Sequence, residues 1–168
     1  IAKRSRVIYY NPVNVSAEDM EGLTYEDLSD PKWKGRVAIR SSGNMYNQSL
    51  VASLIANNGV DATEKWAHRF VGNFARKPEG NDRAQIMAVA NGEADVAVAN
   101  SYYIGLMLSG KKGEEQQAAA RKVELHFPGQ DGRGAHINVS GAGLMKNAPN
   151  AGNAVKFIEF LLSEEAQS

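Results

Sequence analysis

The chain has 168 residues, a length that fits one domain or a domain with a smaller appended piece. Its 19 lysines and arginines balance its 19 aspartates and glutamates, so net charge favours neither nucleic acid nor an anionic membrane as a partner. The absence of cysteine excludes disulfides, thiol catalysis and thiolate metal sites. No apolar run reaches the roughly 20 residues of a membrane-spanning helix, so we expect no membrane insertion.

Strands and helices alternate along most of the chain. Short runs of apolar and β-branched residues predict strands at residues 7–10, 36–39, 96–99, 123–127 and 136–139. Apolar residues at helical spacing predict helices at residues 50–58, 62–74, 83–91, 104–108 and 151–167. This order is typical of an α/β protein whose mostly parallel sheet is flanked by helices.

The predicted strand at 96–99 ends in a polar segment that contains two adjacent tyrosines, Tyr102 and Tyr103. Ligands of open α/β sheets bind beyond the carboxyl ends of the strands, so this segment is a candidate binding site. Neighbouring residues of an extended chain face opposite sides, and the backbone must therefore turn here if both phenols are to meet one ligand. By spacing alone, packing on a surface turn is the commoner role of such a pair.

A second polar segment, residues 41–48, follows the strand at 36–39 and leads into a helix. Unpaired backbone N–H groups at a helix N-terminus, together with the helix dipole, attract a small anion or a phenolate. Ordinary helix capping is an equally common use of residues of these types.

Four segments, taken together, resemble the periplasmic ferric-iron-binding proteins of bacterial ABC importers. They are Ser42-Gly43-Asn44-Met45-Tyr46-Asn47-Gln48-Ser49-Leu50, Asn100-Ser101-Tyr102-Tyr103, Gln130-Asp131-Gly132-Arg133-Gly134 and Val139-Ser140-Gly141-Ala142-Gly143. Their order is that of the family, and the resemblance extends over nearly the whole chain. It implies a periplasmic, non-enzymatic protein that binds ferric iron and delivers it to an inner-membrane ABC permease.

The family has two lobes that hold the ligand in the cleft between them. The resemblance implies that residues 1–132 form most of the second, C-terminal lobe, and that residues 133–168 cross the hinge and return in part to the first. The N-terminal portion of the first lobe, which supplies a further ligand in some members, is missing. The apolar side of the helix at 151–167 would then lack its usual neighbours, so we expect the helix either to drive self-association or to refold onto another surface.

The resemblance also implies a set of site residues. Tyr102 and Tyr103 correspond to the family's paired iron-binding tyrosines, and Tyr46 corresponds to the third tyrosine of one branch. In that branch a carbonate-like anion completes the site, and the matching anion-binding residues here are Arg6, Ser42 and Gly43. The residues expected to support these ligands from around the site are Arg4, Asn100 and Asp82.

The chemistry of these residue types agrees with a ferric site. Ferric ion is a small, hard, highly charged cation that prefers anionic oxygen ligands, and three phenolates would balance its charge. Phenol has a pKa of about 10, so the metal itself must displace the protons at neutral pH. A bound carbonate or bicarbonate would need a positive partner such as Arg6, and acidification should release the iron.

Two other functions stay open at this point. The chain could be a solute-binding lobe for another anion or a small organic ligand, or the effector-sensing lobe of a transcription regulator, although no helix-turn-helix is visible. An enzyme is the weakest hypothesis, because the sequence has no G-x-S-x-G elbow and no evident nucleophile–base or carboxylate pair. His126 and His136 are expected to be hydrogen-bonded structural residues rather than metal ligands.

Overall fold

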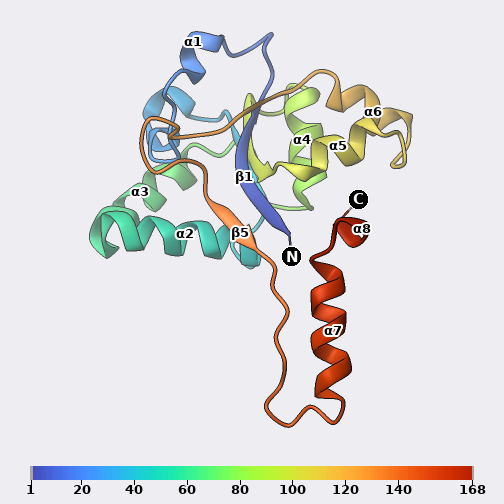
Figure 1. Ribbon diagram of the computed structural model, residues 1–168. Helices are drawn as coiled ribbons and strands as arrows, with labels where there is room; N and C mark the ends of the chain where they lie inside the picture. Colours follow the sequence, from blue (N-terminus) through green and yellow to red (C-terminus); the bar gives the residue numbers. More distant parts are fainter. Residues whose placement is uncertain (1, 168) are drawn as a thin grey trace.

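The computed structural model describes residues 2–167 and shows an α/β body from which the last part of the chain projects as an arm (Figure 1). The strands are β1 (Lys3–Tyr10), β2 (Val37–Ile39), β3 (Val96–Asn100), β4 (Glu124–His126) and β5 (Ile137–Val139). The helices of the body are α1 (Ala17–Met20), α2 (Met45–Asn58), α3 (Val60–Gly72), α4 (Asp82–Ala90), α5 (Tyr102–Leu108) and α6 (Glu114–Ala120), with 3-10 turns at Asp27–Ser29 and Pro31–Trp33. The arm carries α7 (Ala151–Leu161) and α8 (Glu164–Gln167).

The sheet confirms the α/β class with flanking helices, but it is mixed rather than mostly parallel. Its order is β2-β3-β1-β4, and β5 pairs with the first part of β1. β2 and β3 are parallel because helices connect them, which is the crossover that parallel neighbours require. The long strand β1 enters the body from the opposite end, so it lies antiparallel to β3, β4 and β5.

The helix boundaries differ from the expected ones at two informative places. α5 begins at Tyr102, two residues earlier than expected, so both tyrosines lie in its first turn. The expected helix at 151–167 is interrupted after Leu161, where the amide of Leu162 donates to Glu159 and that of Ser163 to Phe160. The chain therefore ends in two helices, α7 and α8, instead of one.

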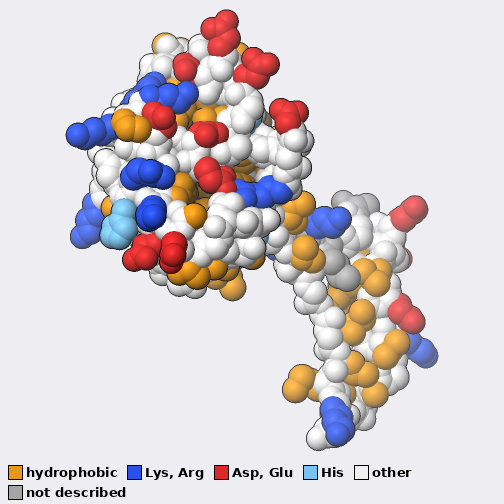
Figure 2. Space-filling model, turned by 90° about the vertical axis from the view of Figure 1, so that its left-hand side faces the viewer, with side chains coloured by type: hydrophobic (Ala, Val, Ile, Leu, Met, Phe, Trp, Pro, Cys, Tyr) orange, Lys and Arg blue, Asp and Glu red, His pale blue; other side chains and the backbone are white. Residues whose placement is uncertain are grey.

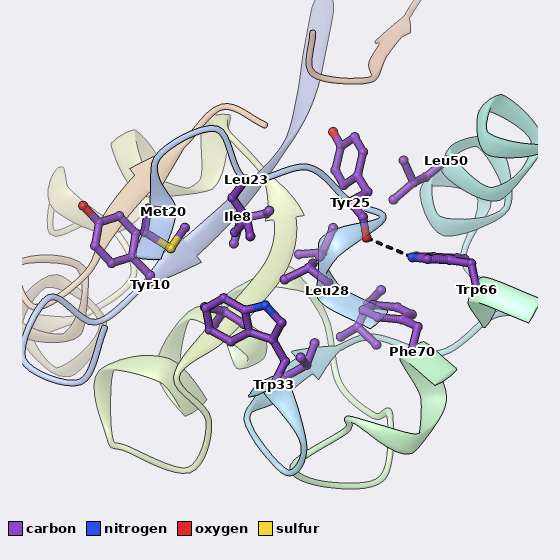
Figure 3. Packing of buried hydrophobic residues seen from close by; sticks show 14 of the residues in the cluster. Ile8, Tyr10, Met20, Leu23, Tyr25, Leu28, Trp33, Leu50, Trp66 and Phe70 are labelled. Atoms are coloured by element: carbon purple, nitrogen blue, oxygen red, sulfur yellow. Dashed lines mark hydrogen bonds between the residues drawn. The ribbon is translucent and has the colours of Figure 1, made fainter. Parts of the chain in front are cut away.

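The core lies on both faces of the sheet, because successive side chains of β1 point to opposite sides. Ile8 joins a cluster that includes Trp33, Trp66 and Phe70 (Figure 3), while Val7 joins a cluster beneath α4 and α5 on the other face. The rings of Trp66 and Phe70 are stacked with centroids 4.7 Å apart. Both clusters therefore fix β1 in the centre of the body.

A fully buried ion pair links β1 to the start of α4. The Nη1 atom of Arg6 donates to Oδ2 of Asp82 at 2.8 Å, and neither side chain is exposed. The other terminal nitrogen of Arg6 donates to Asn47 Oδ1 on α2 (2.6 Å) and to the carbonyl of Val98 on β3 (3.0 Å). Burial lowers the pKa of Arg6, and the charge of Asp82 opposes that shift.

The arm leaves the body through β5 and exposes apolar side chains along its length (Figure 2). α7 has no buried residue, and Phe157, Phe160 and Leu162 are 60%, 45% and 54% exposed. The expected apolar side of this segment is thus present and uncovered. No helix within residues 2–167 is long and apolar enough to cross a membrane.

The loop before α4 generates a prediction about Gly80. An alanine here would need the left-handed backbone of Gly80 (φ +71°), and its Cβ would lie 2.8 Å from Cβ of Ala84 in the first turn of α4. Gly22 is a matched control, because it has φ +67° and nothing within 4 Å of such a Cβ. We expect Gly22→Ala to lower the free energy of unfolding by about 1–2 kcal/mol and Gly80→Ala by more, measured in urea. Equal losses would contradict the predicted clash.

The buried ion pair generates a second prediction. Asp82→Asn leaves the Arg6 guanidinium buried without a negative partner, so we expect the free energy of unfolding to fall by about 3–5 kcal/mol. The control is Asp95→Asn, which breaks the partly exposed pair of Arg36 and Asp95 and should cost about 1 kcal/mol or less. Denaturant unfolding of both variants measures the difference, and similar losses in the two would refute the special role of the buried pair.

Candidate metal centre

Two tyrosines stand side by side where β3 ends and α5 begins. The backbone turns at Ser101, whose φ and ψ of −60° and −35° are helical, which supplies the turn that the sequence analysis required. The rings of Tyr102 and Tyr103 have centroids 4.2 Å apart and are tilted by 30°. Tyr102 is 43% exposed and Tyr103 is half-buried, so both phenols lie at the surface of the body.

The third tyrosine, Tyr46, lies in the first turn of α2 and is half-buried. Its amide donates to the side chain of Asn44, which caps the helix, at 3.2 Å. Burial raises the pKa of Tyr102, and contacts with Tyr103 and the charge of Tyr46 raise it further. Tyr46 and Tyr103 are therefore close enough to Tyr102 to influence its ionisation.

The raised pKa of Tyr102 has a chemical consequence. A phenol is protonated at neutral pH in any case, and the proton of Tyr102 is harder still to remove, because a phenolate here would be partly desolvated and beside two other phenols. A cation that binds here must displace the protons, which favours a strong Lewis acid. Tyr46 is the second residue of α2 and Tyr102 is the first residue of α5, so both side chains start from the first turn of a helix.

The two expected arginines occupy different places although both project from β1. Arg4 is half-buried, its guanidinium carbon lies 6.0 Å from the ring centroid of Tyr102, and its Nη1 donates to Ser140 Oγ. Arg6 is completely enclosed and its terminal nitrogens are bonded inside the body. Arg4 is thus the arginine that lies beside a candidate ligand, whereas Arg6 is enclosed within the body.

The expected anion-binding loop precedes α2 and is open to solvent. Ser42 and Gly43 are both exposed, and the carbonyl of Ser42 accepts from Gln48 Nε2 at 3.1 Å. A Cβ at Gly43 would meet nothing nearer than Ser41 Oγ at 3.8 Å. The loop therefore has room for a small group next to the helix turn that holds Tyr46.

Asn100 and Asp82 are fully buried, so they lie beneath the tyrosines rather than on an open surface. Asp82 Oδ2 accepts from the amide of Asn100 at 2.9 Å in addition to its bond with Arg6. Within residues 2–167 the side-chain amide of Asn100 has no hydrogen-bond partner for either of its polar atoms. Both residues hold the end of β3, from which the tyrosine pair follows.

The sequence analysis did not predict two further residues of the buried hydrogen-bond network around Arg6 and Asp82. They are Arg40 and Asn47. Arg40 follows β2, and its Nη1 lies 3.4 Å from Oδ1 of Asp82. Asn47 Nδ2 donates to the carbonyls of Arg40 and Ser41 at 2.7 and 3.2 Å, while its Oδ1 accepts from Arg6. Their positions just after a strand and in the first turn of a helix were the available signal, because such positions gather at one edge of the sheet.

The histidines have the structural roles expected of them. His126 Nε2 lies 2.9 Å from the carbonyl of Leu23, and His136 Nε2 lies 2.8 Å from Ser49 Oγ. Burial lowers the pKa of His136, and the nearby charge of Arg6 lowers it further. Among residues 2–167 no three His, Asp or Glu side chains are grouped so that they could hold a metal ion, so we consider the phenol oxygens as ligands.

Known proteins similar to this chain include iron-binding proteins. Iron uptake protein A1 of Synechocystis is 58% identical over 166 residues, which are 99% of this chain and 45% of that protein. The major ferric iron-binding protein of Neisseria meningitidis is 30% identical over 99% of this chain and 48% of its own length. The chain spans about half the length of the curated relatives it matches.

The solved structures that are similar to this chain also include iron-binding proteins. A Trichodesmium protein in complex with iron and citrate ligands has a TM-score of 0.93 and 55% identity, over 99% of this chain and 52% of its own. The open form of ferric iron-binding protein A of Mannheimia haemolytica has a TM-score of 0.88 and 40% identity, over 99% and 51%. The pattern of one family matches residues 1–168 throughout, and this chain belongs to that family, the bacterial extracellular solute-binding proteins.

Proposed function

We propose that this chain binds ferric iron through the phenolate oxygens of Tyr46, Tyr102 and Tyr103, as cargo for import rather than as a catalytic metal. The observation that carries the proposal is the meeting of three tyrosines at the starts of two helices on one edge of the sheet. Support also comes from relatives that are named as ferric iron-binding and iron uptake proteins. This role requires no catalysed reaction on a substrate.

The charges around the tyrosines suit an iron site with an added anion. Arg6 and Arg40 bring two positive charges against the single negative charge of Asp82, so the buried network beneath the site has an excess of one positive charge. Three phenolates neutralise one ferric ion, and a further anion then gains from a nearby cation. Because protons compete with iron for phenolate oxygen, acidification should release the metal.

Arg4 is the residue that we assign to the anion, together with the backbone amides of Ser42 and Gly43. Its guanidinium lies beside Tyr102 and is partly open to solvent, whereas Arg6 has no exposed surface. Carbonate or bicarbonate fits such a site as a small planar anion. Citrate is the second candidate, because the similar Trichodesmium structure is described as a complex with iron and citrate.

In the longer protein, we assign residues 1–132 to one lobe and residues 133–168 to the hinge and to part of the other lobe. The body has its own two-sided core, while α7 in the arm has no buried residue. The rest of the first lobe would cover the apolar side of α7. Such a two-lobed protein would work in the periplasm and pass its iron to an ABC permease of the inner membrane.

Titration of the metal-free protein with chelated ferric iron tests the site. We expect a coloured one-to-one complex with a tyrosinate-to-iron charge-transfer band, which fades as the pH is lowered. Tyr103→Phe should weaken the band, because it deletes one of the three proposed ligand oxygens. Tyr10→Phe is the control, since Tyr10 is the last residue of β1 and its hydroxyl donates to Glu124 on β4. An absence of colour in a folded protein, or an equal effect of both variants, would contradict the proposal.

The uncovered arm predicts that this chain alone self-associates through α7. Its mass in light scattering should rise with concentration, because Phe157 and Phe160 expose apolar surface that a second copy can bury. Replacing both by serine should leave a monomer with an unchanged body. Val13→Ser, which alters a residue 88% exposed on the body, should behave as the parent does. A parent chain that stays monomeric at every concentration would refute the prediction.

A further inference from the structure

The arm is joined to the body by a two-stranded ribbon. In this ribbon, the first residues of β1 (Lys3–Ser5) pair with β5 (Ile137–Val139), and the amide of Ser140 donates to the carbonyl of Ala2 at 2.9 Å. Figure 1 shows β5 leading out of the body toward α7. The angle at which the ribbon leaves the body therefore sets where the arm lies.

The pattern of hydrogen bonds between β1 and β5 changes at the base of the ribbon. The next residues in register there are Arg6 and His136. The amide of Arg6 donates directly to the carbonyl of His136 at 2.9 Å. The return bond of a regular antiparallel pair is replaced by the hydroxyl of Tyr25. This hydroxyl accepts from the amide of His136 at 2.9 Å and donates to the carbonyl of Arg6 at 2.6 Å. Beyond this point β1 pairs with β4 instead.

Tyr25 is held firmly by the core that surrounds it. Its side chain is 3% exposed, and its carbonyl accepts from Nε1 of Trp66 at 2.9 Å (Figure 3). Burial raises the pKa of Tyr25 to about 12, so the hydroxyl keeps its proton and continues to donate to Arg6. The bridge between the two strands is thus anchored in the body rather than in the ribbon.

The imidazole of His136 connects the same place to the helix of a candidate ligand. Its Nε2 lies 2.8 Å from Oγ of Ser49, and Ser49 is three residues after Tyr46 on α2. Residues three apart lie on the same side of a helix, so the contact joins the ribbon to the side of α2 that presents Tyr46. Movement of the ribbon and movement of the first turns of α2 are therefore linked.

We propose that Tyr25 and the contact of His136 with Ser49 form a latch that fixes the ribbon against α2, and that they are positioning residues for iron capture. The part of this inference that concerns iron rests on the proposed function. The latch lets the body set the angle of the ribbon while Tyr46 stays in place. In the longer protein the same latch would set how firmly the first lobe closes over the metal.

The latch itself is tested without metal, by amide hydrogen exchange of Tyr25→Phe. This change keeps the ring in the core but removes the acceptor of the His136 amide, so exchange at His136 and at β5 should become about tenfold faster or more. Exchange between β1 and β3 should not change, and Tyr10→Phe should leave β5 as it is in the parent. Unchanged exchange at His136, as would follow if its amide bonded directly to Arg6, would overturn the proposal.

The motion of the ribbon is tested with spin labels on Tyr25→Phe, on a further variant, Ser49→Ala, and on the control Tyr10→Phe. Because the chain has no cysteine, Val139→Cys and Lys65→Cys place one label on β5 and one on α3. The distance distribution should broaden in Tyr25→Phe and in Ser49→Ala, and it should stay narrow in Tyr10→Phe. An equally narrow distribution in all variants would refute the latch even if iron binds as proposed.

The rate of iron release distinguishes an effect of the latch from an effect on the metal ligands. Iron should leave Tyr25→Phe and Ser49→Ala about tenfold faster than the parent, at the same charge-transfer wavelength, because all three tyrosine ligands are retained. Parent protein that binds no iron would contradict the proposed function while the exchange and label results still decide the latch. Parent-like release from both variants would overturn their positioning role.

Discussion

The buried ion pair between Arg6 and Asp82 is the interaction on which the arrangement of the site depends. It joins β1 to the start of α4, and through Asn47 and the amide of Asn100 it also holds α2 and the end of β3. A buried charge without its partner costs several kcal/mol, so these four elements have one favourable placement. That placement brings the starts of α2 and α5, with their tyrosines, to the same edge of the sheet.

The electrostatics of this edge favour a highly charged cation. The phenol of Tyr102 resists ionisation because it is partly buried beside two other phenols, so a weakly acidic cation would not displace its proton. The excess positive charge of the buried network and the nearby Arg4 would then favour an anion next to a bound metal. The occupant that we propose, a ferric ion with a small carboxylate or carbonate, would satisfy both demands.

The body and the arm are stabilised in different ways. The body buries a cluster on each face of its sheet, whereas α7 buries none of its residues and meets the body through the ribbon of β1 and β5. Because the ribbon is short, a few hydrogen bonds at its base decide its angle. Tyr25 supplies two of them from a fixed position in the core.

The sequence by itself determined the α/β class, most of the longer elements and the tyrosine segment after β3, since local apolar runs, caps and breaks encode these features. Only the tertiary structure decided that Arg6 is enclosed against Asp82, which lies 76 positions further along the chain. It also decided that β1 runs antiparallel to its neighbours and that Tyr25 bridges two strands. Periodicity reports on neighbours along the chain, whereas these contacts depend on how distant segments pack.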